Sequence, residues 1–200
     1  MSPIKALIFD VDGTLAETER DGHRVSFNQA FAEAGLAWNW SVELYGELLE
    51  VTGGKERIQH YVRTYHPNFL LPHRLEALAS ALHRNKSRHY QKLLQKGYIG
   101  LRPGVKRLLA TALEDNIRLA IATTSSLGSV LTLLETTLGS ESLAWFDVIA
   151  AGDVVPQKKP APDIYHYVLD KMALSPQTCL VIEDSRQGLT AAQRAGIPTV

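Results

Sequence analysis

The chain is poor in cysteine and carries no excess of charge. Its 200 residues include one cysteine, Cys179, which excludes an internal disulfide framework. Cys179 lies in an apolar run, where a buried core thiol is expected rather than a nucleophile. Lys and Arg together number 21, and so do Asp and Glu, so the formal net charge is zero. A balanced charge gives no general attraction to nucleic acid or to an anionic membrane.

Long hydrophobic runs are also missing. No apolar stretch is long enough to span a bilayer, and the opening residues enter a strand pattern at once, unlike a signal or transit peptide. The hydrophobic content of 45% is ordinary for a globular protein. We therefore expect a soluble, cytoplasmic, monomeric protein whose partners are small molecules.

Two acids follow an apolar run near the start of the chain. The run from Ile4 to Phe9 is broken only by Lys5 and leads into Asp10 and Asp12. Side chains alternate along a strand, so these two acids would share a face if the strand continued, and Gly13 then lets the backbone turn away. In an open α/β sheet, ligands bind at this end of the strands.

Carboxylates this close repel each other, and a hard cation such as Mg²⁺ relieves the repulsion. Phosphoryl transfer fits such a site, with one aspartate attacking phosphorus and the other handling the proton. The alternative is a turn in which the aspartates cap backbone amides. A calcium loop is disfavoured, because its further oxygen ligands and terminal Glu do not follow.

The pattern of apolar residues divides the chain into a helical segment and an alternating one. Residues 17–98 indicate helices over 19–34, from Ser41 to about 49, over 55–65 and over 73–95, with a turn at Thr52-Gly53-Gly54. The rest indicates strands at 4–9, 117–123, 146–150, 179–182 and 197–200, with helices between them. This predicts a Rossmann-like, doubly wound parallel α/β sheet over residues 1–16 and 99–200, with an all-helical insertion at 17–98.

Three later stretches carry polar residues at predicted strand ends or before helices. Thr123 and Thr124 close a strand before a helix, which suits an anion site or simply a helix cap. Lys159 precedes a proline and is favoured over Lys158 as a cation for the site, the alternative being a solvated lysine pair. An apolar strand then ends in Glu183 and Asp184, either of which could complete a Mg²⁺ shell, while Asp184 or Ser185 could also cap the next helix.

These four segments in this order resemble the four motifs of the haloacid dehalogenase superfamily of phosphohydrolases. The resemblance implies that Asp10 is the nucleophile, Asp12 the acid and base, and that Thr123, Thr124 and Lys159 hold the phosphoryl group. It also implies a Mg²⁺ ion held by Asp10, the main-chain carbonyl of Asp12, and Asp184, with Glu183 acting through water. The helical insertion resembles the C1 cap of the subfamily that includes β-phosphoglucomutase.

Several further stretches resemble the CbbY proteins of photosynthetic bacteria and plastids, among them Gly53-Gly54-Lys55-Glu56-Arg57 and Ala151-Gly152-Asp153-Val154-Val155-Pro156. The resemblance implies hydrolysis of xylulose 1,5-bisphosphate, an inhibitor of Rubisco in the Calvin cycle, to xylulose 5-phosphate. The candidate substrate contacts are Glu17, His23, Gly54, Lys55, Arg57 and Lys86. Surface cations at a helix start, and a solvated Lys86, are the alternatives from the residues alone. Two other functions stay open: a phosphomutase, and a non-catalytic sugar-phosphate-binding protein.

Overall fold

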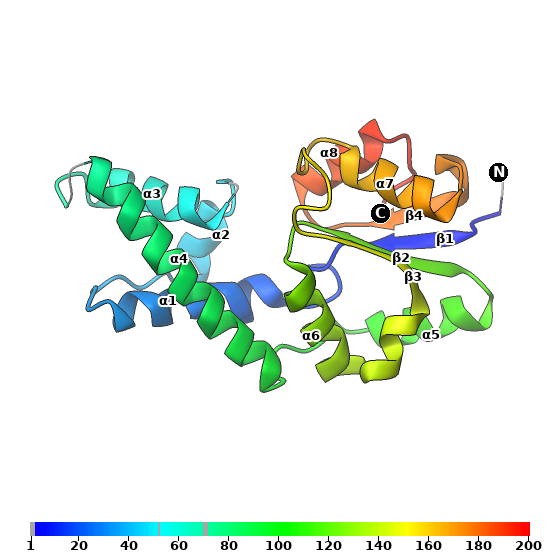
Figure 1. Ribbon diagram of the computed structural model, residues 1–200, viewed down its shortest axis with the longest axis horizontal. Helices are drawn as coiled ribbons and strands as arrows, with labels where there is room; N and C mark the ends of the chain where they lie inside the picture. Colours follow the sequence, from blue (N-terminus) through cyan, green and yellow to red (C-terminus); the bar gives the residue numbers. More distant parts are fainter. Residues whose placement is uncertain (1–2, 52, 70–71) are drawn as a thin grey trace. The chain divides into compact units, whose positions relative to one another are not determined.

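The core sheet has four parallel strands. The computed structural model describes residues 3–51, 53–69 and 72–200, and the strands stand in the order β3-β2-β1-β4 (Figure 1). Their bounds are Ala6–Phe9 for β1, Arg118–Thr123 for β2, Phe146–Ala151 for β3 and Cys179–Ile182 for β4. Each neighbouring pair runs parallel, so the strands end at one common edge. This confirms the parallel α/β sheet predicted from the sequence.

The register of the central strand determines what lies at that edge. All four residues of β1 are buried, because a strand with neighbours on both sides and helices on both faces must be apolar throughout. Phe9 at its end lies beside Ile121 of β2 and Ile182 of β4. The next residues along the three chains, Asp10, Ala122 and Glu183, therefore meet beyond the end of β1.

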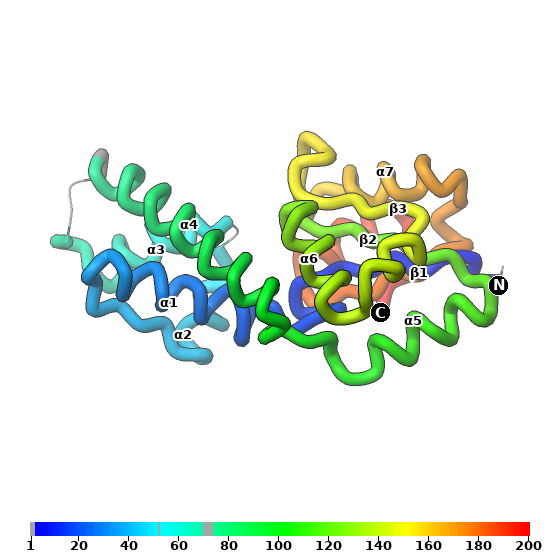
Figure 2. The backbone as a smooth tube through the Cα atoms, turned by 60° about the horizontal axis from the view of Figure 1, so that its bottom comes forward, coloured from blue at the N-terminus to red at the C-terminus, as the bar shows by residue number. Residues whose placement is uncertain are grey.

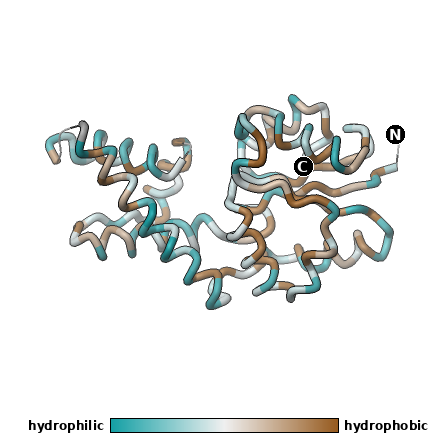
Figure 3. The backbone as a smooth tube through the Cα atoms, in the orientation of Figure 1, coloured by the Kyte–Doolittle hydropathy of each residue, from teal (hydrophilic) through white to brown (hydrophobic). Residues whose placement is uncertain are grey.

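Helices cover both faces of the sheet. Figure 1 shows α5 (Val105–Glu114) and α6 (Leu127–Leu138) on one face and α7 (Asp163–Met172) and α8 (Arg186–Arg194) on the other. Two short 3₁₀ helices, Ser140–Trp145 and Pro176–Thr178, precede β3 and β4. The strands are the most hydrophobic part of this unit (Figure 3). No helix among the described residues has the length and apolar character that crossing a bilayer requires.

The chain divides into two compact units, Met1–Thr18 with Leu94–Val200, and Glu19–Leu93. The second unit is helical and has no assigned strand among its described residues. Its elements, seen in Figure 2, are a π-helical turn at Glu19–His23, α1 (Arg24–Glu33), α2 (Val42–Leu48), α3 (Gly54–Tyr65) and α4 (Pro72–Gln95), which continues just past the unit.

Aromatic rings form the core of the helical unit. Phe27, Phe31 and Tyr61 pack around Trp40, with the ring centroids of Phe31 and Trp40 4.9 Å apart at an interplanar angle of 72°. Edge-on contacts of this kind match the negative ring face to the positive ring edge. Asn28 fixes the loop that carries Trp40, since its side chain donates to the Trp40 carbonyl at 3.0 Å and accepts from the Trp40 amide at 2.8 Å.

The structure refines three local predictions. The helix expected over residues 19–34 begins as a π-turn, and the Ser26 hydroxyl satisfies the Gly22 carbonyl at 2.8 Å. Ser41 caps α2 as predicted, accepting from the Leu44 amide at 3.2 Å. Residues 197–200 run beside β4 through an isolated bridge at Thr199. The turn expected at Thr52 lies outside the described residues.

Ile8→Ala tests the packing of β1. Ile8 is fully buried, so truncation should lower the free energy of unfolding by about 2–5 kcal/mol. Ile4, one turn of the strand pattern earlier, is 37% exposed, and Ile4→Ala should cost less than about 1 kcal/mol. Urea denaturation of both variants measures the difference; equal losses would contradict the assignment of β1 as the buried central strand.

Candidate active site

Lys159 lies at the centre of the polar cluster at the carboxyl edge of the sheet. Its ammonium donates to Asp10 Oδ1 at 2.8 Å, to the Ala122 carbonyl at 2.9 Å and to Glu183 Oε1. These are the residues that the register places next after β1, β2 and β4. The Lys159 side chain is 5% exposed, and the Asp10 and Glu183 side chains are 10% and 0% exposed. The structure therefore joins three of the predicted motifs through one buried ammonium.

Burial and charge act in opposite directions on this cluster. Burial raises the pKa of Asp10 to about 7, although the ammonium of Lys159 beside it pulls the pKa down. Burial alone would lower the pKa of Lys159, but the negative charges of Asp10 and Glu183 outweigh it and hold that pKa above its ordinary value. Lys159 is thus a permanent cation, while Asp10 needs further positive charge to be fully ionised at neutral pH.

Both carboxylate oxygens of Glu183 already have protein partners. Oε1 accepts from Lys159 and from the Tyr165 hydroxyl at 3.2 Å, and Oε2 accepts from the Ser185 amide at 3.2 Å and its hydroxyl at 3.0 Å. Tyr165 on α7 is fully buried, and the Lys159 ammonium lies 5.2 Å from its ring centroid. Sequence reasoning missed Tyr165, because on a helix a buried tyrosine reads simply as core.

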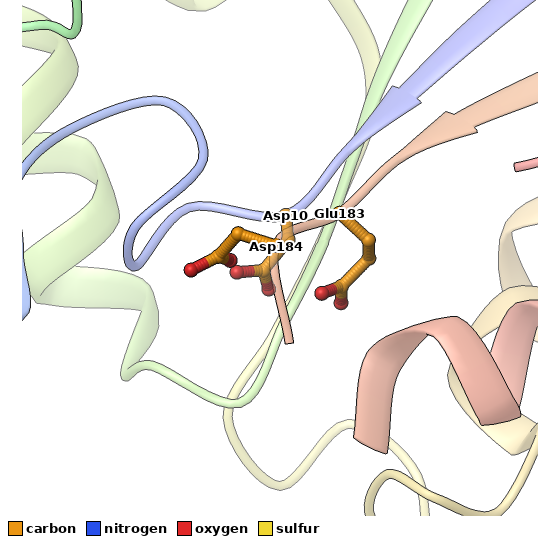
Figure 4. A group of neighbouring side chains, drawn as sticks. All are labelled: Asp10, Glu183 and Asp184. Atoms are coloured by element: carbon orange, nitrogen blue, oxygen red, sulfur yellow. The ribbon is translucent and has the colours of Figure 1, made fainter. Parts of the chain in front are cut away.

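Asp184 lies beside this cluster and faces outward. Its Oδ1 accepts from the Thr14 hydroxyl at 2.9 Å, and burial raises the pKa of its carboxyl group. One carboxylate oxygen from each of Asp10, Glu183 and Asp184 falls within 4.8 Å of the others (Figure 4). Hard carboxylate oxygens at this spacing suit a divalent cation such as Mg²⁺, so the residues present fit the metal that the sequence implied.

Gly13 keeps the backbone clear of Asp184. It has φ of +86°, and a Cβ built on it would overlap the Asp184 carboxylate. A glycine is therefore required twice at this position, for the left-handed backbone and for the close approach of the acid.

Asp12 is held by two hydroxyl groups. Thr18 donates to its Oδ1 at 2.6 Å and Ser125 to its Oδ2 at 2.5 Å. Ser125 belongs to the loop after β2, whose buried Thr123 accepts from the Ser125 amide at 3.1 Å. The side chains of Asp12 and Thr123 are thus linked through Ser125, which sequence reasoning had noted only as part of a polar stretch.

The other residues of the β2–α6 loop have different surroundings. Thr124 is exposed, and Ser126 caps α6 by accepting from the Ser129 amide at 3.3 Å. The cap and the anion site that the sequence left as alternatives are therefore compatible, because Ser126 does the capping. Elsewhere in this unit, Glu17 pairs with Arg102 at 2.7 Å.

In the helical unit, Lys86 is buried beside His23. Its ammonium lies 2.7 Å from His23 Nδ1 and 5.2 and 4.9 Å from the ring centroids of Phe27 and Tyr90. Lys86 is 8% exposed, which excludes the solvated surface lysine that the sequence left open. Imidazole and aromatic faces compensate part of the cost of burying this charge.

Gly54 and Lys55 begin α3. A side chain on Gly54 would meet the ring of His83 at 2.6 Å, so the glycine permits close packing there. Lys55 is exposed. Burial lowers the pKa of His83, and the positive charges of Lys86 and Lys55 lower it further, which indicates a positive local potential.

Arg57 is engaged within the helical unit. Its guanidinium donates to the carbonyls of Leu48 and Val51 at 3.0 and 3.2 Å and to the Tyr45 hydroxyl at 3.1 Å. Tyr45 in turn donates to Glu19 at 2.5 Å. These bonds give Arg57 the structural task of joining α2 to α3, and its contact with substrate stays a prediction.

This geometry agrees with comparisons to known proteins. A family profile of haloacid dehalogenase-like hydrolases matches residues 4–196. The chain belongs to this family of hydrolases, as its opening motif had suggested.

Within the family the chain is similar to CbbY proteins. It is 47% identical over 197 residues to the plasmid-encoded protein CbbY of Cupriavidus necator, covering 98% of this chain and 77% of that protein. A crystal structure of CbbY from Rhodobacter sphaeroides with phosphate superposes with a TM-score of 0.83 and 45% identity, covering 98% of this chain and 84% of that one. The D10N variant of that protein, in complex with xylulose 1,5-bisphosphate, matches with the same TM-score and coverage.

Gly188→Ala tests the packing around Glu183. Gly188 is buried in α8, and a Cβ there would overlap the Glu183 carboxylate. We expect the variant to lose about 1–3 kcal/mol of stability through overpacking and at least about tenfold in hydrolase activity, as Lys159 loses its partner. Thermal unfolding and phosphate release from an ester measure the two effects.

Gly128→Ala is the matched control, because Gly128 also lies in the first turn of a helix but has open space around it. It should keep full activity and gain up to about 1 kcal/mol. Equal behaviour of the two variants would contradict the role of Gly188.

Proposed function

We propose that the protein is a phosphatase, a phosphoric monoester hydrolase, that acts through phosphorylation of Asp10. The observation that carries the proposal is the buried pairing of Asp10 with Lys159 beside Asp184. It sets a carboxylate nucleophile next to a permanent cation and an acidic metal site. The similarity to CbbY proteins and the hydrolase family support the same reaction class.

In the first half-reaction, an Asp10 oxygen attacks phosphorus and the bond to the sugar oxygen breaks. Asp12 gives its proton to the leaving oxygen. In the second, a water oxygen attacks the phosphorus, Asp12 takes the water proton, and the bond to Asp10 breaks to release phosphate. Lys159, the Thr123 hydroxyl and the Thr124 amide hold the phosphoryl oxygens where negative charge develops.

A Mg²⁺ ion would be held by Asp10, the main-chain carbonyl of Asp12, and Asp184, and would supply positive charge to the phosphoryl group. The partners of Glu183 favour an indirect role for this residue: its oxygens accept bonds from Lys159, Tyr165 and Ser185, so it would reach the ion through water.

The proposed substrate is xylulose 1,5-bisphosphate, which would give xylulose 5-phosphate. The support is the complex of the Rhodobacter sphaeroides CbbY variant with this compound. In the helical unit, the positive potential around His83, Lys86 and Lys55 suits a second phosphate group. We propose that His23, Gly54, Lys55, Arg57 and Lys86, with Glu17, contact the sugar bisphosphate.

Two other functions make different predictions. A phosphomutase of the β-phosphoglucomutase type would return the phosphate to another hydroxyl and form an isomer. A non-catalytic sugar-phosphate-binding protein would release no phosphate; the complete set of acids at the sheet edge favours an enzyme over it.

Asp10→Asn should remove the nucleophile. We expect phosphate release with Mg²⁺ to fall by at least about 1,000-fold, because an amide oxygen is a far weaker nucleophile. The melting temperature should stay within a few degrees of the original. The control is Asp153→Asn, since the Asp153 side chain is 89% exposed and pairs only with the surface Lys158 among the contacts described. Appreciable turnover by Asp10→Asn would reject the nucleophile assignment.

A phosphate-release panel tests the substrate. We expect kcat/KM for xylulose 1,5-bisphosphate to exceed the values for ribulose 1,5-bisphosphate, fructose 1,6-bisphosphate and β-glucose 1-phosphate by at least about tenfold, because one added phosphate contact is worth about 1.4 kcal/mol or more. Chromatography of the sugar products separates hydrolysis from isomer formation. Equal rates on all four compounds would reduce the proposal to a general sugar phosphatase.

A further inference from the structure

Asp12 has both of its carboxylate oxygens engaged by hydroxyl groups from different segments. Thr18 reaches Oδ1 at 2.6 Å and Ser125 reaches Oδ2 at 2.5 Å. Asp12 itself is partly exposed, so packing alone does not fix its side chain. The two hydroxyl groups thus fix the plane in which the carboxylate lies.

The loop that carries Ser125 is itself held in place. The Ser125 amide donates to Thr123 Oγ1 at 3.1 Å, and Ser126 caps α6 immediately afterwards. The residue therefore sits between a buried strand end and a capped helix, two rigid elements. A hydroxyl group on such a support can orient a neighbouring side chain with little motion of its own.

We propose that Ser125 is a positioning residue for Asp12, holding its carboxylate in line for both proton transfers of the phosphatase reaction. The proposal rests on the function proposed above and deepens it. Ser125 need not touch the substrate; it acts through Asp12.

The two half-reactions explain why Asp12 needs this support. Protonated Asp12 first gives its proton to the departing ester oxygen as the phosphorus–oxygen bond breaks, which leaves Asp12 as a carboxylate. That carboxylate then takes a proton from the attacking water as the bond between phosphorus and Asp10 breaks, which restores the acid. Proton transfer needs hydrogen-bond geometry in both steps, so a carboxylate free to rotate would be slow in each.

Ser125→Ala tests the proposal through the dependence on the leaving group. With phenyl phosphate, whose leaving group is poor, both half-reactions need Asp12, and we expect kcat to fall about 10- to 100-fold with KM changed less than about threefold. With 4-nitrophenyl phosphate the leaving group departs without a proton. The variant should then release one equivalent of 4-nitrophenolate per enzyme at close to the wild-type rate, followed by slow turnover.

Two further variants separate positioning from a general loss of structure. Ser125→Thr keeps the hydroxyl group and should recover at least about half of kcat. Ser126→Ala removes the neighbouring helix cap, so it should lower the melting temperature but leave the kinetics unchanged. A crystal structure of Ser125→Ala should show the Asp12 carboxylate rotated away from its present position.

The outcomes distinguish failure of this inference from failure of the proposed function. If the wild type releases no phosphate from any of these esters, the phosphatase proposal fails, and the rotation of Asp12 in the crystal structure of the variant still tests the positioning role. If the wild type is active and Ser125→Ala matches it on phenyl phosphate, or if Asp12 keeps its position in the variant, the inference is wrong.

Discussion

The buried ammonium of Lys159 holds the catalytic edge of the sheet together. It contacts Asp10, the Ala122 carbonyl and Glu183, which follow three neighbouring strands in register. A buried charge of this kind is tolerated only when it is fully paired, so each partner depends on the others. The strand register therefore determines the chemistry: a shift of one residue in β1 or β4 would move an acid to the wrong face.

The neighbouring helices then determine how the ammonium is used. Glu183 is bonded on both oxygens, by Tyr165 from α7 and by Ser185 at the start of α8. Gly188 makes room for its carboxylate in the first turn of α8. Because Glu183 is immobilised in this way, it orients Lys159 toward Asp10. Asp184, which accepts a hydrogen bond from the Thr14 hydroxyl, faces outward and stays accessible. Two adjacent acids thus take separate tasks because their surroundings differ.

The sequence predicted the strands and the order of the motifs well, since hydrophobic runs ending in acids are strong local signals. Cys179–Ile182 was predicted with its observed bounds, and Ser41 as the cap of α2. What the sequence could not show depends on contacts between distant segments. Tyr165 reads as a core residue of a helix, and Gly188 reads as a weak point in one. Their roles appear only when the fold brings Glu183 against both. Lys86 was similarly ambiguous until aromatic rings were found around it.

The balance of charge at the sheet edge bears on how metal and phosphate bind. Asp10, Asp12, Glu183 and Asp184 together outweigh the positive charge of Lys159, and burial already raises the pKa of Asp10 to about 7. A phosphate dianion brought to this edge alone would meet net repulsion, and Asp10 would be partly protonated and a poor nucleophile. A divalent cation reverses both effects, because it neutralises the acids and favours the ionised form of Asp10. By thermodynamic linkage, phosphate must then tighten the binding of the metal as much as the metal tightens the binding of phosphate. The acidic edge would thus become competent for an anionic substrate only together with its cation.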